Sequence, residues 1–190
     1  MSFPESVEPE PQVFPFSISH SFSAASLTNK TAIFGLLASI FIASHLNAEV
    51  KADRIIVHKK SRTMELMSGG RVLKTYKIAL GSEPVGPKTR QGDHRTPEGI
   101  FVIDRRNAQS QFHRSLHISY PRPEDRERAR QLGVSPGGDI FIHGLPNGYG
   151  LVGAAHRLRD WTDGCIAVTD QEIEQIWRMV DDGATVEIHP

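Results

Sequence analysis

Residues 54–80 read RIIVHKKSRTMELMSGGRVLKTYKIAL, and this stretch decides the class of fold. It contains three short runs of β-branched or alternating apolar residues, at 54–58, 63–67 and 71–80. Turn-forming residues separate the runs, with Ser61 in the first turn and Ser68, Gly69 and Gly70 in the second. Runs of this kind between turn residues are typical of a meander of antiparallel strands. The stretch therefore predicts a mainly β domain.

The rest of the chain continues this pattern. Residues 81–99 are polar and rich in Gly and Pro, which predicts a long exposed loop, and such loops are often functional. Further strands are expected at 100–104, 112–120, 139–144 and 185–188. Because these strands are short and only two or so helices flank them, we expect a β-sandwich or barrel-like domain with peripheral helices.

Two helices can be predicted from their end signals. Residues 123–131 are highly charged, which predicts a short surface helix. The second helix has a capping box, with Thr169 as N-cap and Glu172 three residues later. Its apolar residues follow at helical spacing and predict one buried stripe: Ile173, Ile176, Trp177 and Val180. We expect this helix to end at Gly183.

Composition excludes several classes of function. The 190 residues include 22 basic and 22 acidic side chains, so the chain lacks the basic surface that binding of nucleic acid requires. A single cysteine excludes an internal disulfide and a cysteine-rich zinc site. We expect no cofactor, no metal and no nucleic-acid partner, and the sequence says nothing about oligomeric state.

The N-terminal part is set apart from the fold. Residues 1–29 show no period, and we expect either a disordered leader or sequence upstream of the true translation start. Lys30 then precedes a short apolar run that ends before Glu49, as in a secretory signal peptide at 30–48. The prediction is therefore an exported protein of the periplasm or cell envelope, with a catalytic domain at 52–190. A buried helix or an uncleaved anchor at 30–48 is the alternative.

Cys165 and His143 are candidates for a nucleophile and its base. Cys165 follows Gly164, and His143 ends an apolar strand 22 positions earlier, a separation that suits two adjacent strands joined by a long loop. The carbonyl of Gly144 could hold the second ring nitrogen of His143. The backbone N–H groups of Gly164 and Cys165 could face a developing oxyanion.

Thr162 and Asp163 are placed to order the turn before the cysteine. A different interpretation stays open on spacing alone, because a lone cysteine is often a small buried apolar residue and a histidine at a strand end is often only hydrogen-bonded.

Three other patterns are weaker. Residues 81–88 resemble a phosphate-binding loop, but Pro87 precedes the lysine and no Ser or Thr follows in register. His113 and His117 have the spacing of helical metal ligands, yet their segment is predicted to be a strand and has no evident carboxylate partner. Ser61 and Ser82 lack the small-residue elbow of a serine hydrolase.

Two motifs resemble the signature of the L,D-transpeptidase catalytic domain family (YkuD or ErfK type). They are Ile142-His143-Gly144 and Thr162-Asp163-Gly164-Cys165, and further similar stretches extend over 54–188. The resemblance implies a β-sandwich-like fold with the thiol in a cleft. It also implies acylation of Cys165 by a peptidoglycan stem peptide, with His143 as general acid and base. The terminal D-residue leaves, and an amine resolves the thioester into a cross-link.

This chain departs from the family pattern at three positions. Thr162 and Asp163 replace the usual serine and histidine, and Ala167 replaces an arginine that often follows the cysteine by two residues. A carboxylate gained and a cation lost should make the thiolate harder to form.

Two other outcomes stay open. Water or another amine could resolve the same thioester, giving a carboxypeptidase, an endopeptidase or an amidase for wall-linked protein. The chain could also be a non-catalytic wall-binding domain, and a Cys165 no more reactive than free cysteine would favour that interpretation.

Overall fold

The computed structural model describes residues 50–190. The leader expected at 1–29 and the signal peptide expected at 30–48 lie outside the described residues. Within the described part, no helix has the length and apolar content needed to cross a bilayer.

The first three strands form the predicted antiparallel meander: β1 (Ala52–His58), β2 (Thr63–Ser68) and β3 (Arg71–Lys77). Ile55 faces Leu66 across the first pair, and both are fully buried. The third strand is shorter than predicted. After it, Ala79 leaves β2 and forms an isolated bridge with Ala167 instead, so residues 78–80 lead toward the other end of the sheet.

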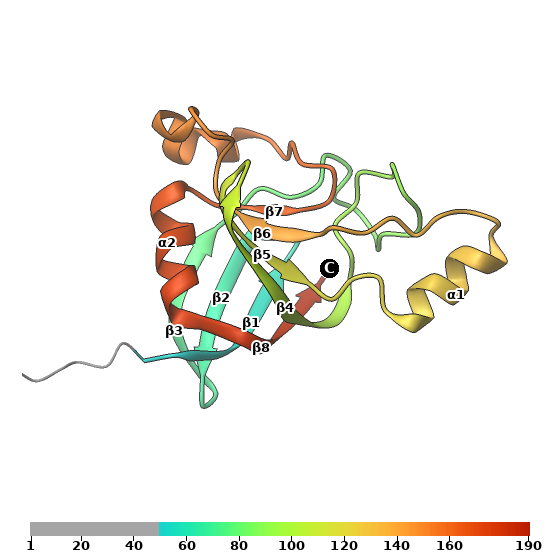
Figure 1. Cartoon of the computed structure of the whole chain (residues 1–190), viewed down its shortest axis with the longest axis horizontal. Helices are drawn as coiled ribbons and strands as arrows, with labels where there is room; N and C mark the ends of the chain where they lie inside the picture. The colour runs from blue at the N-terminus through green and yellow to red at the C-terminus, as the bar shows by residue number, and fades with distance from the viewer. Residues whose placement is uncertain (1–49) are drawn as a thin grey trace, which may run out of the picture. The chain divides into compact units, whose positions relative to one another are not determined.

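Five more strands complete one eight-stranded sheet: β4 (Gly99–Ser110), β5 (His113–Ile118), β6 (Phe141–His143), β7 (Ile166–Ala167) and β8 (Val180–His189). Their order is β3-β2-β1-β8-β4-β5-β6-β7. The pairs β1–β8 and β6–β7 are parallel, so the antiparallel pattern of the first strands does not extend through the sheet. Figure 1 shows the sheet curled, with β5–β7 at a steep angle to β1–β3. This half-barrel confirms the mainly β, barrel-like prediction.

The two predicted helices are present, with one boundary corrected. α1 (Pro123–Gln131) has the predicted bounds, and α2 (Asp170–Met179) begins after the Thr169–Glu172 capping box. The predicted end of α2 at Gly183 is wrong. Val180 has extended backbone and is fully buried in β8, where it faces Ala52 of β1. Gly183 lies inside that strand with a φ of 88°.

A third helical element was not predicted. The 3-10 helix η1 (Gly150–Leu158) lies between His143 and Cys165 in sequence, with a kink at Gly153. Its residues include several exposed apolar side chains, so it lacks the buried stripe by which a helix can be recognised from sequence.

The core lies between the sheet and α2. Ile173 and Ile176 are fully buried in it, as the stripe predicts, whereas Trp177 is only partly buried. Because α2 packs on β5, β6 and β8, its N-terminus comes close to the segment that follows His143.

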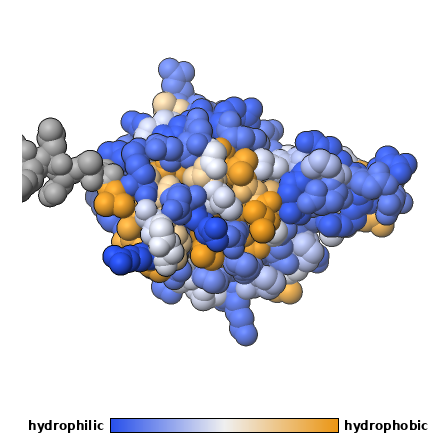
Figure 2. Space-filling view, turned by 90° about the horizontal axis from the view of Figure 1, so that it is seen from below, coloured by the Kyte–Doolittle hydropathy of each residue, from blue (hydrophilic) through white to orange (hydrophobic). Residues whose placement is uncertain are grey.

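The outer surface is mixed in polarity. Figure 2 shows hydrophobic residues gathered among hydrophilic ones over the middle of the face seen from below. Exposed apolar side chains include Val72 of β3 and Ile100 of β4. Scattered exposed apolar residues are normal in folded domains, so they define no site by themselves.

Candidate active site

The fold brings Cys165 and His143 to one cavity. His143 ends β6, Cys165 directly precedes β7, and these two strands are parallel neighbours in which His143 faces Ala167. Both side chains line a cavity of about 400 Å³. The adjacent strands that the sequence predicts are therefore present, and η1 belongs to the connection between them.

The imidazole of His143 is held in one tautomer. Its Nδ1–H donates to the carbonyl of Gly144 at 2.6 Å, which leaves Nε2 as a hydrogen-bond acceptor. The ring packs 4.5 Å from that of Phe112 and 5.9 Å from that of Trp161, measured between centroids. Only 3% of the residue is exposed, and this burial lowers the pKa of His143 to about 4, against the opposing effect of the Gly144 bond. At neutral pH the ring is therefore neutral and ready to accept a proton.

The thiol of Cys165 is protonated in the same conditions. Burial raises the pKa of Cys165 to about 11; a hydrogen bond from the Phe141 backbone lowers it, and the negative charge of Asp163 raises it. The thiol donates to the carbonyl of Asp139, with 3.7 Å between sulfur and oxygen. Asp163 therefore acts in the direction predicted from sequence, although burial is the larger cause. The resting pair is neutral, so nucleophilic attack must be coupled to proton removal.

Thr162 orders the turn that carries the cysteine. Its hydroxyl donates to the Cys165 carbonyl at 2.7 Å and accepts from the Gly164 N–H at 3.1 Å. In the resting site the Gly164 N–H is therefore already bonded within the turn. Its expected use as an oxyanion donor, together with the Cys165 N–H, stays a prediction.

Position 164 requires a glycine because its backbone conformation is one that other residues rarely adopt and because a side chain there would clash. Its φ is 125°, and an added Cβ would lie 2.6 Å from the carbonyl oxygen of Arg95. The 81–99 segment thus packs against the back of the cysteine turn, and part of it is buried rather than exposed as predicted.

Asp163 connects to this same segment. Its side chain is 91% exposed and accepts a 2.8 Å hydrogen bond from Nδ1 of His94. It therefore links the cysteine turn to the 81–99 segment, whereas Thr162 makes the hydrogen bonds within the turn.

The segment after His143 is held by Asp170, which sequence reasoning missed. Asp170 is the first residue of α2, and its Oδ1 accepts the Leu145 N–H at 2.8 Å. A Cβ on Gly144 or on Gly150 would lie 2.7 or 2.6 Å from its two carboxylate oxygens. This carboxylate therefore fixes the position of the Gly144 peptide, whose oxygen orients His143. The only sequence signal was its place inside the capping box.

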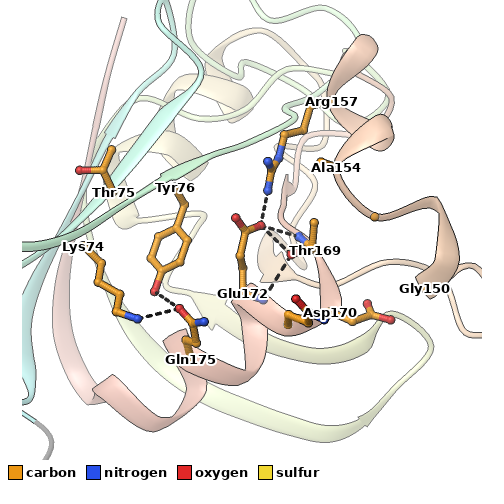
Figure 3. Close-up of a pocket in the computed structure, with 12 residues that line it drawn as sticks. Lys74, Thr75, Tyr76, Gly150, Ala154, Arg157, Thr169, Asp170, Glu172 and Gln175 are labelled. Carbon is orange, nitrogen blue, oxygen red and sulfur yellow. Dashed lines mark hydrogen bonds and ion pairs between the residues drawn. The ribbon is translucent and has the colours of Figure 1, made fainter.

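A larger cavity behind Asp170 lacks the candidate catalytic groups. It has a volume of about 640 Å³ and is lined by β3, η1 and the start of α2 (Figure 3). Its polar groups pair with one another: Arg157 contacts Glu172, and Lys74 donates to Gln175 at 2.9 Å. The buried Nε of Arg157 has no hydrogen-bond partner among the described residues. Since the cavity holds neither Cys165 nor His143, size alone does not make it the reactive site.

The other patterns noted in the sequence have separate partners. His113 and His117 each bond a carboxylate, Glu174 and Asp104, which sequence inspection did not find. The two rings bond different carboxylates, and no metal-binding group of three or more ligands occurs among the described residues. Lys88, at the end of the loop that resembles a phosphate site, is buried and paired with Asp93 at 2.8 Å.

Ala167, one of the departures from the family pattern, lies inside the sheet. It is fully buried in β7, and its N–H and carbonyl bond the backbone of Ala79 at 2.8 and 3.0 Å. Because Ala167 has no exposed surface, a cationic side chain at this position would have to be buried or displace its neighbours.

Comparison with protein families gives one match over most of the chain. A family model described as the L,D-transpeptidase catalytic domain (YkuD) matches residues 52–188. Among curated proteins, the chain is similar to the putative L,D-transpeptidase YafK of Escherichia coli strain K12, with 28% identity over 159 residues. That match covers 77% of this chain and 56% of YafK, so the chain spans little more than half the length of this relative.

Solved structures agree on the fold. The helical cell shape determining protein Pgp2 from Campylobacter jejuni aligns with a TM-score of 0.55 and 24% identity, covering 75% of this chain and 51% of that one. Bd1075 from Bdellovibrio bacteriovorus aligns with a TM-score of 0.51 and 21% identity, covering 76% and 50%.

Proposed function

This chain belongs to the L,D-transpeptidase catalytic domain family, and on that premise we propose that it transfers acyl groups of peptidoglycan stem peptides through a thioester on Cys165. His143 serves as general base and then as general acid. One observation carries the proposal: Cys165 and His143, far apart in sequence, line one cavity in which the imidazole keeps Nε2 free to accept a proton.

Acylation begins with attack of Sγ on the carbonyl carbon that precedes the terminal D-residue. The S–H proton passes to Nε2 of His143 as the C–S bond forms, because neither group is charged beforehand. The developing oxyanion accepts from the Cys165 N–H. Collapse breaks the C–N bond, and His143 returns the proton to the leaving amine. The thioester remains on the enzyme.

A second amine completes the transfer. Its nitrogen attacks the thioester carbonyl, its proton passes to His143, and the C–S bond breaks to restore the thiol. If water attacks instead, the product is a shortened stem peptide. Since both routes share the same thioester, the acceptor that reaches it decides between transpeptidation and carboxypeptidation.

The cavity has walls suited to a peptide. Three aromatic side chains, Phe112, Phe141 and Trp161, supply apolar surface, and Asn107 and Ser115 add polar groups. A volume of about 400 Å³ lies within the usual range for small-ligand sites. These features support binding of a short stretch of stem peptide beside the sulfur.

The proposal is tested with a purified disaccharide-tetrapeptide. Mass spectrometry of the products should reveal dimers for a transpeptidase or tripeptides for a carboxypeptidase, and intact-protein mass should reveal the acyl group on Cys165. We expect Cys165→Ala to abolish every product and His143→Ala to abolish nearly all. Unchanged turnover by the Cys165→Ala protein would refute the thioester route.

We also propose that the protein is exported, with residues 30–48 as the signal that directs it. N-terminal peptide mass spectrometry of the protein recovered from cells tests this proposal. A mature terminus close to Glu49 supports it, and recovery of peptides from 10–30 in the envelope fraction contradicts it.

A further inference from the structure

A buried lysine lies outside the cavity that holds the sulfur. Lys59 directly follows β1, and only 2% of its side chain is exposed. Its Nζ donates three hydrogen bonds, to the Gly86 carbonyl at 2.6 Å, the Thr96 carbonyl at 3.0 Å and Oε1 of Glu98 at 2.7 Å. Burial lowers the pKa of Lys59, and the hydrogen bond and charge of Glu98 oppose that shift. An ammonium has three N–H donors, so every donor of this one has an acceptor.

All three acceptors belong to the 81–99 segment. The Gly86 carbonyl is on the outgoing arm of this segment, and the other two acceptors are on its returning arm. One ammonium therefore joins the two arms. The lysine itself is fixed on the sheet, because the backbone N–H of Lys59 donates to the carbonyl of His189 in β8 at 3.0 Å. The segment is thus anchored to the ends of two neighbouring strands.

The anchored segment supports the turn that carries the cysteine. The carbonyl oxygen of Arg95 lies against the back of this turn, 2.6 Å from where a Cβ on Gly164 would be. Thr96, an acceptor of the ammonium, is the next residue, and its hydroxyl accepts the Gly81 N–H at 3.0 Å. Gly81 in turn forms a bridge with Thr162 of the cysteine turn. A shift of the returning arm would therefore shift the turn and the sulfur with it.

Stability alone is a poor explanation for this buried cation. Removing a charged group from water is costly, and well-packed apolar side chains often stabilise a fold equally well or better. A buried ammonium instead imposes geometry, because its three N–H groups require three acceptors placed around one nitrogen. Without it, the Gly86 and Thr96 carbonyls lose the bonds that hold the two arms together.

We propose that Lys59 is a positioning residue for the reaction, which holds the two arms of the 81–99 segment in the arrangement that supports the turn carrying Cys165. It contacts neither the sulfur nor the cavity beside it, and it acts through the peptides of Arg95 and Thr96. This inference rests on the proposed function, because its consequence is measured as the rate of thioester formation.

Two variants separate positioning from stability. Lys59→Met leaves Glu98 without its cation, whereas the Lys59→Met/Glu98→Gln double variant removes both charges. Each is compared with the native protein, in single turnovers with a tetrapeptide, at a temperature where urea titration shows it to be folded. We expect both to form the thioester about 10- to 100-fold more slowly, because misplacement of a reacting group by about 1 Å can cost about 100-fold. The loss should fall on the maximal rate and leave the half-saturating tetrapeptide concentration within about 3-fold of the native value.

Two further variants complete the series. Glu98→Ala removes one of the three acceptors, from a side chain that is 18% exposed, and should slow thioester formation by about 3- to 10-fold even if the Lys59 variants do not fold. Lys51→Met is the matched control. Lys51 precedes the other end of β1, is half exposed and pairs with Asp181 at 2.7 Å. Its substitution breaks an ion pair of the same kind and should leave the rate within about 2-fold. A native rate in the folded double variant or in Glu98→Ala, or an equal loss in Lys51→Met, overturns the inference.

Amide hydrogen exchange separates this inference from the proposed function, because it requires no catalysis. The Ser82 and Glu83 N–H groups donate to the carbonyls of Thr162 and His94 at 2.9 and 3.1 Å. In the double variant these two amides should exchange at least about 10-fold faster than in the native protein, while the amides of β2 keep their rates. Faster exchange there, with no thioester on the native protein, would contradict the proposed function alone. A native thioester, with unchanged exchange in the double variant, would contradict this inference alone.

Discussion

The reactivity of Cys165 toward iodoacetamide should be far below that of a free thiol. Only the thiolate reacts, and burial raises the pKa of Cys165 from an ordinary value of 9.0 to about 11. Two pKa units lower the thiolate fraction at pH 7 by about 100-fold. We therefore expect alkylation of the folded protein to be about 100-fold slower than that of the same chain in urea, where the sulfur is solvated.

The pH profile and one substitution refine this prediction. The rate should rise about tenfold per pH unit up to pH 10 or beyond, since the thiolate fraction follows the pKa. Asp163→Asn removes a negative charge that raises the pKa of Cys165, so the rate should increase. Because the Asp163 side chain is 91% exposed, solvent screens its charge and the increase should stay below about 5-fold.

The assay is intact-protein mass spectrometry of timed samples from pH 6 to 11, which is unambiguous because the chain has one cysteine. A rate that levels off below pH 8, or that equals the rate in urea at pH 7, would refute the reasoning. Either result would mean that His143 holds the sulfur as a thiolate in the resting site.

The structure also changes what slow labelling means. From sequence alone, an unreactive Cys165 favours a non-catalytic wall-binding domain. Burial of the thiol predicts slow labelling in an enzyme as well. Acylation by a stem peptide, rather than alkylation, therefore distinguishes the enzyme from the binding domain.

Three further predictions concern the groups around the sulfur. Burial lowers the pKa of His143 from 6.5 to about 4, so between these values the unfolded chain binds a proton that the folded chain does not. The free energy of unfolding should therefore fall by up to about 3 kcal/mol as the pH drops from 6.5 to 4, measured by urea titration at each pH. The His143→Gln variant should lose this part of the pH dependence. Parallel plots of unfolding free energy against pH for the native protein and the variant would contradict the prediction. Asp170→Ala leaves the Leu145 N–H without its acceptor, so it should lower the free energy of unfolding by about 1–3 kcal/mol and slow acylation of Cys165. Asp170→Asn should restore part of both. Equal acylation rates in the native protein and the Asp170→Ala variant would argue against a positioning role. Gly164→Ala combines strained backbone with a Cβ placed 2.6 Å from a carbonyl oxygen, so it should destabilise by at least about 2 kcal/mol. Gly69→Ala, which has a positive φ but open space, should cost about 1–2 kcal/mol in the same thermal or urea assay, and an equal loss in both variants would remove the steric argument.

The strand and helix predictions succeeded where the local pattern and the tertiary environment agree. Residues 54–58 form a β-branched run and residues 63–67 alternate, and Ile55 and Leu66 face one core, so the local pattern identified β1 and β2. Thr169 and Glu172 carry the whole N-terminal signal of α2 within four residues. The error at the other end of α2 has a tertiary cause: Val180 continues the helical stripe in sequence, but pairing with β1 draws it into β8.

The site was only partly predictable, because its parts come from distant segments. The motif around Cys165 and His143 predicted the candidate pair and its turn residues, and the two side chains line one cavity. The motif could not assign Asp170 to the Leu145 amide, or Trp161 to the ring of His143, because neither contact has a signature in local spacing. The bond between the Gly164 amide and Thr162 likewise depends on the shape of the turn.

The sequence by itself determined the β-rich class and the starts of both α-helices and gave Cys165 and His143 as candidates, since each follows from residue type and short-range spacing. Tertiary structure alone decided the protonation states of that pair, the bond between the Gly164 amide and Thr162, and the cavity that both side chains line. The physical reason is that desolvation and hydrogen bonding depend on which distant side chains and carbonyls surround a group, and only the folded chain brings them together.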